Sequence, residues 1–224
     1  MSKQVPKEAF KFLNKLAKNN DRDWFNEHKS EFKSLKSEVK AVFEDLMVKV
    51  QEHDRIQRLK VFRIYRDIRF SKDKTPYKTH ISANYIRVKP DLRGSYYLHL
   101  EPGNSFIGAG FWAPEKDDLL RIRKEFEMDA DEIREILKDR NLIKHWGELQ
   151  GDELKTAPRD FDKEHQNIDL IRKKQFIFSK ALSDELVLSD QLVDHVNDAF
   201  KAIRPFFDYM TEVLTTDENG VSLI

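Results

Sequence analysis

Cationic side chains crowd the stretch from Phe62 to Thr79, which reads FRIYRDIRFSKDKTPYKT. Between Lys60 and Lys89, nine Lys and Arg residues face two acidic residues, a net charge of +7 in a chain that is neutral as a whole. Concentrated positive charge of this kind is typical of a surface that binds an anionic partner. Guanidinium groups bind phosphate or carboxylate through paired hydrogen bonds, ammonium groups add a point charge, and hydroxyl groups donate further hydrogen bonds. The candidate ligand-binding residues are Arg63, Arg66, Arg69, Ser71, Lys72, Lys74, Tyr77 and Lys78.

Arg66 interrupts an apolar face. If Val61 to Phe70 forms a strand, alternation separates two sets of side chains. One face carries Phe62, Ile64, Arg66, Ile68 and Phe70, and the other carries Arg63, Tyr65, Asp67 and Arg69. A guanidinium taken out of water needs a partner, because breaking a buried pair costs about 3–5 kcal/mol. The partner of Arg66 is either an internal carboxylate, with Asp67, Asp73 or Glu101 as candidates, or a bound anion.

His99 and Glu101 are the second group that could do chemistry, and they share one face of a predicted strand. Their spacing suits acid–base catalysis or the binding of one metal ion, and equally a histidine held in one tautomer by its neighbour. A catalytic zinc needs three protein ligands, and the chain contains neither His-x-His nor His-Glu-x-x-His. The sequence therefore predicts no metal site and no cofactor. The candidate catalytic residues are His99, Glu101 and Asp67.

Strands and helices must position these groups. Residues rich in β-branched and aromatic side chains, or alternating in polarity, predict strands over 61–70, 81–88, 95–101, 105–112 and 174–182. The turn residues Pro102-Gly103-Asn104 predict that the third and fourth of these form a hairpin, and a second small hairpin is expected over 148–155. Gly108 and Gly110 indicate the close approach of another group, in the first place an aromatic ring.

Apolar residues three or four apart predict the helices. Two predicted helices span 7–17 and 30–53, and others begin near Asp21, at Pro114 and after Asp129. The last runs from Ser189 to about Met210, with a kink or break at Pro205. The sequence thus predicts a single α+β domain over residues 1–214, followed by a polar tail over 215–224. Its central sheet should be mostly antiparallel, with helices from both chain ends packed against it.

Composition limits the class of protein. The 224 residues include no cysteine, which excludes disulfides, thiol chemistry and thiolate metal sites. The start lacks an apolar run of signal-peptide length, and no stretch of 18 consecutive apolar residues occurs. We therefore expect a cytoplasmic protein without a membrane partner. Nothing in the sequence specifies an oligomeric state.

Three blocks of the sequence resemble a known family. They are FRIYRDIRFSKDKTPYKT, the later YYLHLEPGNSFIGAGFW with Pro114, and the early Asp23-Trp24-Phe25. Together they resemble the signature blocks of the family known as domain of unknown function 2461, and the resemblance covers most of the chain. It implies a mainly bacterial, cytosolic α+β domain, and it supplies no catalytic residues.

Three functions compete. The first is a binding module for an anionic small molecule, such as a nucleotide, or for a nucleic-acid backbone. The second is an enzyme acting on a phosphorylated or carboxylated small molecule, in which the cations stabilise negative charge and His99, Glu101 or Asp67 transfers protons in one cleft. The third is a structural protein in which Arg66, Asp67, Asp73 and Glu101 form an ion network. The binding module ranks first because it requires only what the sequence shows.

Overall fold

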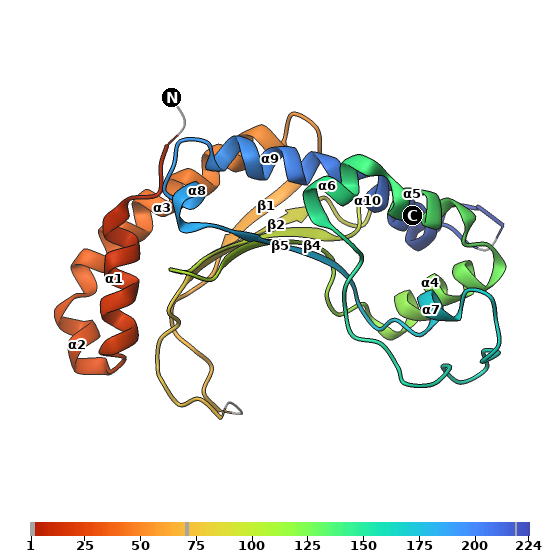
Figure 1. Ribbon diagram of the computed structural model, residues 1–224, viewed down its shortest axis with the longest axis horizontal. Coiled ribbons are helices and arrows are strands. Elements are labelled where there is room, and N and C mark those ends of the chain that lie inside the picture. Colours follow the sequence, from red (N-terminus) through yellow and green to blue (C-terminus); the bar gives the residue numbers. More distant parts are fainter. Residues whose placement is uncertain (1–2, 70–71, 218) are drawn as a thin grey trace. The chain divides into compact units, whose positions relative to one another are not determined.

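Five strands form an antiparallel sheet in the computed structural model, which describes residues 3–69, 72–217 and 219–224 (Figure 1). The strands are β1 (Ile56–Val61), β2 (Ile81–Arg87), β3 (Ser95–Leu100), β4 (Ser105–Phe111) and β5 (Phe176–Leu182). Each strand pairs with the next one along the chain. The predicted α+β class, the antiparallel sheet and the 95–112 hairpin are therefore confirmed.

Helices come from both ends of the chain and from the segment between β4 and β5. They are α1 (Lys7–Lys18), α2 (Arg22–Glu27), α3 (Lys29–Val50), α4 (Lys116–Met128), α5 (Asp131–Lys138), α6 (Arg140–Trp146), α7 (Ile168–Ile171), α8 (Asp184–Val187), α9 (Leu192–Ala202) and α10 (Arg204–Thr215). The predicted break at Pro205 is confirmed, because α9 ends at Ala202 and the proline lies in the first turn of α10. A missing backbone N–H is harmless there. No helix among the described residues has the length and apolar character needed to cross a membrane.

Contacts divide the chain into two compact units. Unit 1 comprises the chain up to Tyr85, Tyr97–Ile107 and Ala181–Asn197. Unit 2 comprises Ile86–Tyr96, Gly108–Lys180 and Asp198–Ile224. Strands β2 to β5 each contribute residues to both units.

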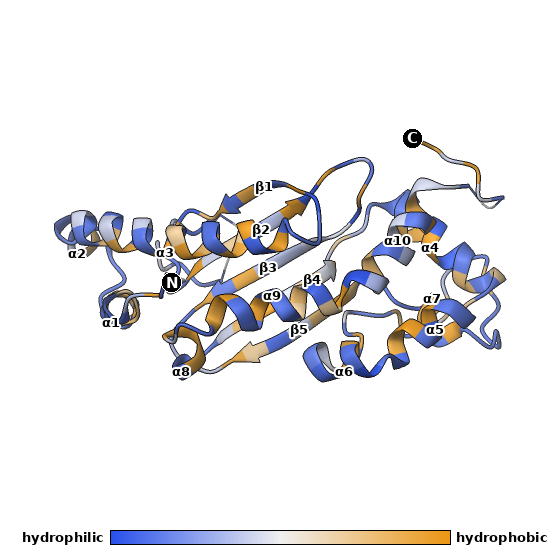
Figure 2. Cartoon of the chain, turned by 90° about the horizontal axis from the view of Figure 1, so that it is seen from above, coloured by the Kyte–Doolittle hydropathy of each residue, from blue (hydrophilic) through white to orange (hydrophobic). Residues whose placement is uncertain are grey.

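In unit 1, the long helix α3 contacts β1 and β2. Its buried stripe is Phe32, Leu35, Val39, Val42, Phe43, Leu46 and Val50, as predicted from the helical spacing. Figure 2 shows hydrophobic and hydrophilic positions alternating along this helix, as expected for an amphipathic element. The buried hydroxyl of Tyr85 on β2 donates to the carbonyl oxygen of Phe43 at 3.1 Å. One face of these strands is therefore committed to packing against α3.

Regular strand pairing ends at Val61, so the predicted strand over 61–70 is wrong in its extent. Beyond it, the chain forms an arm, which we define as residues 62–69 and 72–80; Phe70 and Ser71 lie outside the described residues. The arm has one bridge, Tyr65 to Tyr77, and a backbone hydrogen bond from Lys78 N to Ile64 O at 2.8 Å. No third strand flanks this ribbon within the part of the chain that the structure describes, and a highly charged two-stranded ribbon does not sustain a regular ladder.

The predicted alternation holds along the arm even though the strand does not. Ile64 is buried and Arg66 is half-buried, whereas Arg63, Tyr65, Asp67 and Arg69 are exposed. The start of α2 anchors this arm. Phe25 is 1% exposed and its ring stacks on that of Tyr77, with 4.0 Å between centroids. The Asn20 side chain accepts from Tyr77 N at 3.1 Å and donates to Tyr77 O at 3.0 Å.

In unit 2, Tyr96 of β3 packs on Phe200 and Phe207, at 4.5 and 5.0 Å between ring centroids. Gly110 is required by the approach of β5: an added Cβ would lie 2.1 Å from the carbonyl oxygen of Phe176, and φ is +125°. The close group is thus a neighbouring backbone, not the aromatic ring predicted first.

The small hairpin predicted over 148–155 is wrong. Gln150 bridges to Ile177 and Glu153 bridges to Lys173, so this segment pairs with the edge strand β5 and the residues before it. An edge strand presents unpaired backbone groups, which offer a better partner than a tight turn of the segment on itself.

Candidate functional site

Strand alternation gives unit 1 a second face, opposite to the face that packs on α3. Because Tyr85 points toward α3, the neighbouring side chains of β2 point the other way. We call this second face the polar face. It carries His80, Ser82, Tyr97, His99, Glu101 and Phe106. All six residues belong to unit 1.

Two histidines and a carboxylate meet on the polar face. His99 Nε2 lies 3.2 Å from Glu101 Oε2, and the ring centroids of His80 and His99 are 4.0 Å apart. One ligand atom from each of the three side chains can be chosen so that all lie within 4.8 Å of one another. His99 is 7% exposed, and the other two are partly exposed. The group can thus be reached from solvent on one side.

Neighbouring side chains fix the tautomer of His99. The ionised carboxylate of Glu101 only accepts hydrogen bonds, so Nε2 of His99 carries the proton it donates. Nδ1 then accepts from the hydroxyl of Tyr97 at 3.1 Å. The ring of His99 also stacks on Phe106, with 4.6 Å between centroids. The imidazole is therefore held in one orientation.

Glu101 lies immediately after β3, at the start of the turn that the sequence predicted. The Thr79 hydroxyl donates to its Oε1, and Asn104 Nδ2 donates to Oε2 at 2.9 Å. Its backbone N–H donates to Ser105 Oγ at 3.0 Å. Burial acts to raise the pKa of Glu101, but the hydrogen bonds from Thr79, Asn104 and His99 outweigh it and lower the pKa. The carboxylate is charged at neutral pH.

The histidines are held neutral. Burial, together with the positive charge that His99 would carry, lowers the pKa of His80 to about 4, with Lys78 and Arg66 acting in the same direction and Glu101 opposing them. Burial also lowers the pKa of His99, and it outweighs the hydrogen bond to Glu101 that would raise it. Lys78 adds to this lowering. At pH 7 the polar face thus presents two neutral imidazoles beside one carboxylate.

We expect acid to destabilise the protein through His80. In the unfolded chain this group takes up a proton near pH 6.5, whereas in the folded chain it resists protonation until about pH 4. Stability should be complete above pH 6.5 and fall as the pH drops toward 4. With allowance for the partial exposure of the ring, the loss is about 1–2 kcal/mol. Urea unfolding across this window should show a flatter pH dependence for His80→Asn than for the wild type; parallel curves would contradict the assignment. His195→Asn, at an exposed helical position, is the control.

Cations of the arm border the polar face. Lys78 is half-buried, and its ammonium lies 5.4 Å from the centre of the Phe62 ring. Burial lowers the pKa of Lys78, and the charges of Arg63 and Arg66 lower it further. No carboxylate forms an ion pair with Lys78 within residues 3–69, 72–217 and 219–224. The charges that act on the pKa of Lys78 are therefore positive ones.

Arg66 has the internal partner that the sequence allowed. Its Nη1 lies 2.8 Å from Asp73 Oδ2, and its Nη2 donates to Tyr77 O at 3.5 Å. The Nε atom is buried and finds no hydrogen-bond acceptor among the described residues. Of the three carboxylates proposed, Asp73 is the partner. The guanidinium is thus only partly satisfied within the chain.

Several of the other predicted site residues make their contacts within the arm or with α2. Arg69 pairs with Asp67 through two hydrogen bonds of 3.0 and 2.7 Å, and this pairing lowers the pKa of Asp67 to about 2. Lys74 donates to Ile68 O at 2.9 Å, and Lys72 is exposed. Ser71 lies outside the described residues. The ring of Tyr77, 3% exposed, is a packing element against Phe25.

Two residues were not placed correctly by sequence reasoning. His80 was missed as the third member of the group, although it shares the alternation of Ser82 on β2 and could have been paired with His99 through the antiparallel register. Arg87 was counted with the basic stretch, yet it is fully buried in unit 2. There it stacks over Phe207 at 4.8 Å and pairs with Asp208 at 3.5 Å.

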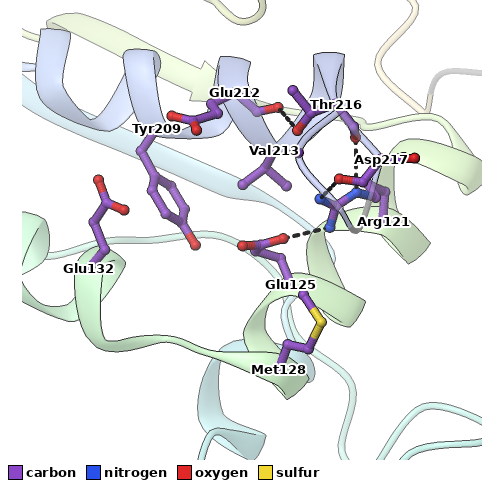
Figure 3. Close-up of a pocket in the computed structure, with 10 residues that line it drawn as sticks. Arg121, Glu125, Met128, Glu132, Tyr209, Glu212, Val213, Thr216 and Asp217 are labelled. Carbon is purple, nitrogen blue, oxygen red and sulfur yellow. Dashed lines mark hydrogen bonds and ion pairs between the residues drawn. The ribbon is translucent and has the colours of Figure 1, made fainter. Parts of the chain in front are cut away.

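A pocket in unit 2 has the opposite electrostatic character. Figure 3 shows Tyr209 between the carboxylates of Glu132 and Glu125, with Glu212 on the same helix as the tyrosine. Burial raises the pKa of Tyr209, and the neighbouring acids raise it further. Arg121 is engaged by Glu125 at 2.6 Å and by the carbonyl oxygen of Asp217 at 3.2 Å. This acidic pocket does not suit an anionic ligand.

Comparison with known proteins identifies the family and no individual relative. No curated protein and no solved structure matches the chain. A family model described as "Conserved hypothetical protein (DUF2461)" matches residues 8–209, which include both the arm and the polar face. The chain therefore belongs to the DUF2461 family, as its sequence blocks indicated.

Proposed function

We propose that this protein binds a phosphate-bearing small molecule on the polar face of unit 1, with the phosphate held by Lys78 and Arg66. The observation that carries the proposal is the state of Lys78. This ammonium is half-buried, the charges of Arg63 and Arg66 lower its pKa, and no carboxylate of the described chain pairs with it. Burying like charges together is unfavourable, and a bound dianion would relieve that cost.

Arg66 strengthens the case for an anion at this place. Its pairing with Asp73 leaves the buried Nε atom without an acceptor among the described residues. The charge of Arg66 also lowers the pKa of both Lys78 and His80. A phosphate oxygen could accept from this guanidinium and from Lys78 at once. Charge-assisted hydrogen bonds contribute about 1.5–3 kcal/mol each, so three of them supply about 4.5–9 kcal/mol to offset the cost of ordering the ligand.

Aromatic rings on the polar face and at the neighbouring start of the arm favour a ligand that carries a ring as well as a phosphate. Phe62, Tyr97 and Phe106 follow one another, with 6.1 and 5.7 Å between successive centroids. All three are half-buried, so part of each ring is open to solvent. Stacking of a base on such rings contributes about 1–3 kcal/mol. A nucleotide combines the two features.

Calorimetric titration with ADP tests this proposal. We expect saturable binding by the wild type and a loss of about tenfold in Lys78→Met, because one charge-assisted hydrogen bond disappears. Lys72→Met removes the same charge from an exposed position of the arm and should change the affinity less than about threefold. Equal losses in the two variants, or no binding by the wild type, would overturn the proposal.

The same titration with a single-stranded oligonucleotide separates the two sources of phosphate. Counterion release makes nucleic-acid affinity fall steeply between about 50 and 200 mM salt. We expect ADP to bind with the shallower salt dependence and the oligonucleotide to gain little over it. Much tighter oligonucleotide binding with a steep salt slope would replace the nucleotide by a nucleic-acid backbone.

An enzyme acting on a phosphorylated small molecule is the second candidate. The observation that favours it is the position of His99, whose Nε2 lies 3.2 Å from Glu101 Oε2 and whose ring lies 4.0 Å from that of His80, between centroids. The charge of Lys78 acts on the pKa of both histidines, so the proposed phosphate-binding cation would be close enough to assist proton transfer. Slow turnover of a phosphate ester that His99→Gln abolishes, with ADP binding retained, would support this candidate. Equal turnover by wild type and variant would exclude His99 from such a role.

A further inference from the structure

We propose that His80, His99 and Glu101 bind one divalent transition-metal ion of the zinc class. The inference goes beyond the proposed function, because it holds whether or not the polar face binds phosphate. The three residues come from the position just before β2, the end of β3 and the turn that follows β3. Their ligand atoms already lie within 4.8 Å of one another, although the residues are up to 21 positions apart in sequence.

The geometry needs a small closure to receive the ion. Zinc binds imidazole nitrogen at about 2.0–2.1 Å and carboxylate oxygen at about 2.0–2.2 Å, so tetrahedral ligand atoms are roughly 3.3 Å apart. His99 Nε2 and Glu101 Oε2, at 3.2 Å, are at that separation already. His80 is at the end of the arm and must move by at most about 1.5 Å, which a side-chain rotation supplies.

Outer partners for two of the ligands are already in place. The hydroxyl of Tyr97 lies 3.1 Å from His99 Nδ1, the nitrogen that faces away from Glu101. When a metal replaces the proton on Nε2, Nδ1 carries the proton and donates it to the tyrosine oxygen, which fixes the ring for coordination. Thr79 and Asn104 hold the carboxylate in the same way. Tyr97 is thus a positioning residue.

The ligand set selects the kind of metal. Two imidazoles and one carboxylate suit zinc and its neighbours, and three protein ligands leave a fourth position open. Calcium takes six to eight oxygen ligands, and magnesium binds through oxygen in octahedral geometry, so a group with two nitrogens suits neither. Phe106 stacks on His99 and closes one side, which limits the access of water to that ligand.

A hydrogen-bonded His–Glu pair without a metal is the competing reading, and His80 distinguishes the two. A structural pair requires only His99 and Glu101, whereas a metal site requires the third ligand. His80 makes no hydrogen bond with another residue in the described chain, and its contact with His99 is between the rings. The ring nitrogens of His80 are therefore available to coordinate an ion.

Titration of the chelator-treated, full-length protein with zinc chloride tests the inference. We expect one ion per chain in calorimetry, and cobalt chloride should give visible absorption bands typical of a low-coordinate site. His80→Asn should bind zinc at least about tenfold more weakly than the wild type. Tyr97→Phe should lose about tenfold in zinc affinity, because the hydrogen bond that orients the His99 ring disappears. His195→Asn, a helical and exposed control within unit 1, should bind as the wild type does.

Circular dichroism confirms that each variant is folded before the titration, and ADP binding is measured separately in chelator. Zinc binding without ADP binding would leave this inference standing while the proposed function fails. The inference is overturned if the wild type shows no saturable zinc binding, or if His80→Asn binds zinc as tightly as His195→Asn does.

Discussion

Replacing Phe25 with alanine is expected to destabilise unit 1 by about 3–5 kcal/mol, because removal of a buried aromatic ring leaves a cavity. Phe25 is almost completely buried and contacts the rings of Tyr77 at 4.0 Å, Phe32 at 5.4 Å and Tyr65 at 6.2 Å. Two of these rings belong to the arm. The variant should therefore lose both stability and the docking of the arm that presents Arg66 and Lys78.

Urea unfolding followed by circular dichroism measures this loss. Phe25→Leu keeps most of the volume and should cost less than the alanine variant, which provides a folded protein if alanine is too disruptive. Val48→Ala, at a position that is 63% exposed, should stay within about 0.5 kcal/mol of the wild type. A Phe25→Ala protein within 1 kcal/mol of the wild type would show that the arm does not depend on α2.

The double variant Arg66→Met/Lys78→Met should bind ADP at least about 100-fold more weakly than the wild type. Each replacement removes a charge-assisted hydrogen bond worth about 1.5–3 kcal/mol, and methionine preserves the length of the apolar stem. The matched variant Arg69→Met/Lys72→Met removes two charges from the same arm, yet Arg69 is already paired with Asp67. We expect that control to lose less than about threefold.

Calorimetry on the two double variants therefore distinguishes a specific binding site at Arg66 and Lys78 from general electrostatic attraction by the basic arm. A site predicts a large difference between them, whereas general attraction by a basic arm predicts similar losses. Urea unfolding of both proteins shows whether either replacement disturbs the fold. Equal losses in two folded proteins would refute the assignment of Arg66 and Lys78.

Local pattern was enough to predict much of the fold. The spacing of Val39, Val42 and Leu46 predicted the buried stripe of α3, and the residues Pro102 to Asn104 predicted the β3–β4 hairpin. Pro205 predicted the break between α9 and α10, because proline fixes φ and has no backbone N–H to donate. These features depend on residues close together in sequence, so the local sequence is sufficient to predict them.

Pairing between distant segments could not be predicted in this way. Glu148 to Lys155 reads as a hairpin by itself, and only the free edge of β5 makes pairing with Ile177 preferable. Arg87 reads as part of a basic stretch, and its burial against Phe207 depends on a helix more than 100 residues later. Tertiary partners decided both outcomes.

The arrangement of the candidate side chains could be predicted only where it depends on local pattern. Alternation placed Arg66 on the inner side of the arm and Asp67 with Arg69 on the outer side, which the structure reproduces. It could not choose between Asp73 and Glu101 as the partner of Arg66, since that choice depends on how the arm folds back. His80 joins His99 only through the register of β2 and β3.

If the polar face of unit 1 receives the proposed ligand, imidazole NMR of the full chain titrated with ADP should detect it. We predict that the signals of His80 and His99 shift with saturation, because both rings belong to the polar face and sense the charge of Lys78, while those of the exposed His195 stay unchanged. Saturable ADP binding that leaves His80 and His99 unshifted would contradict the account.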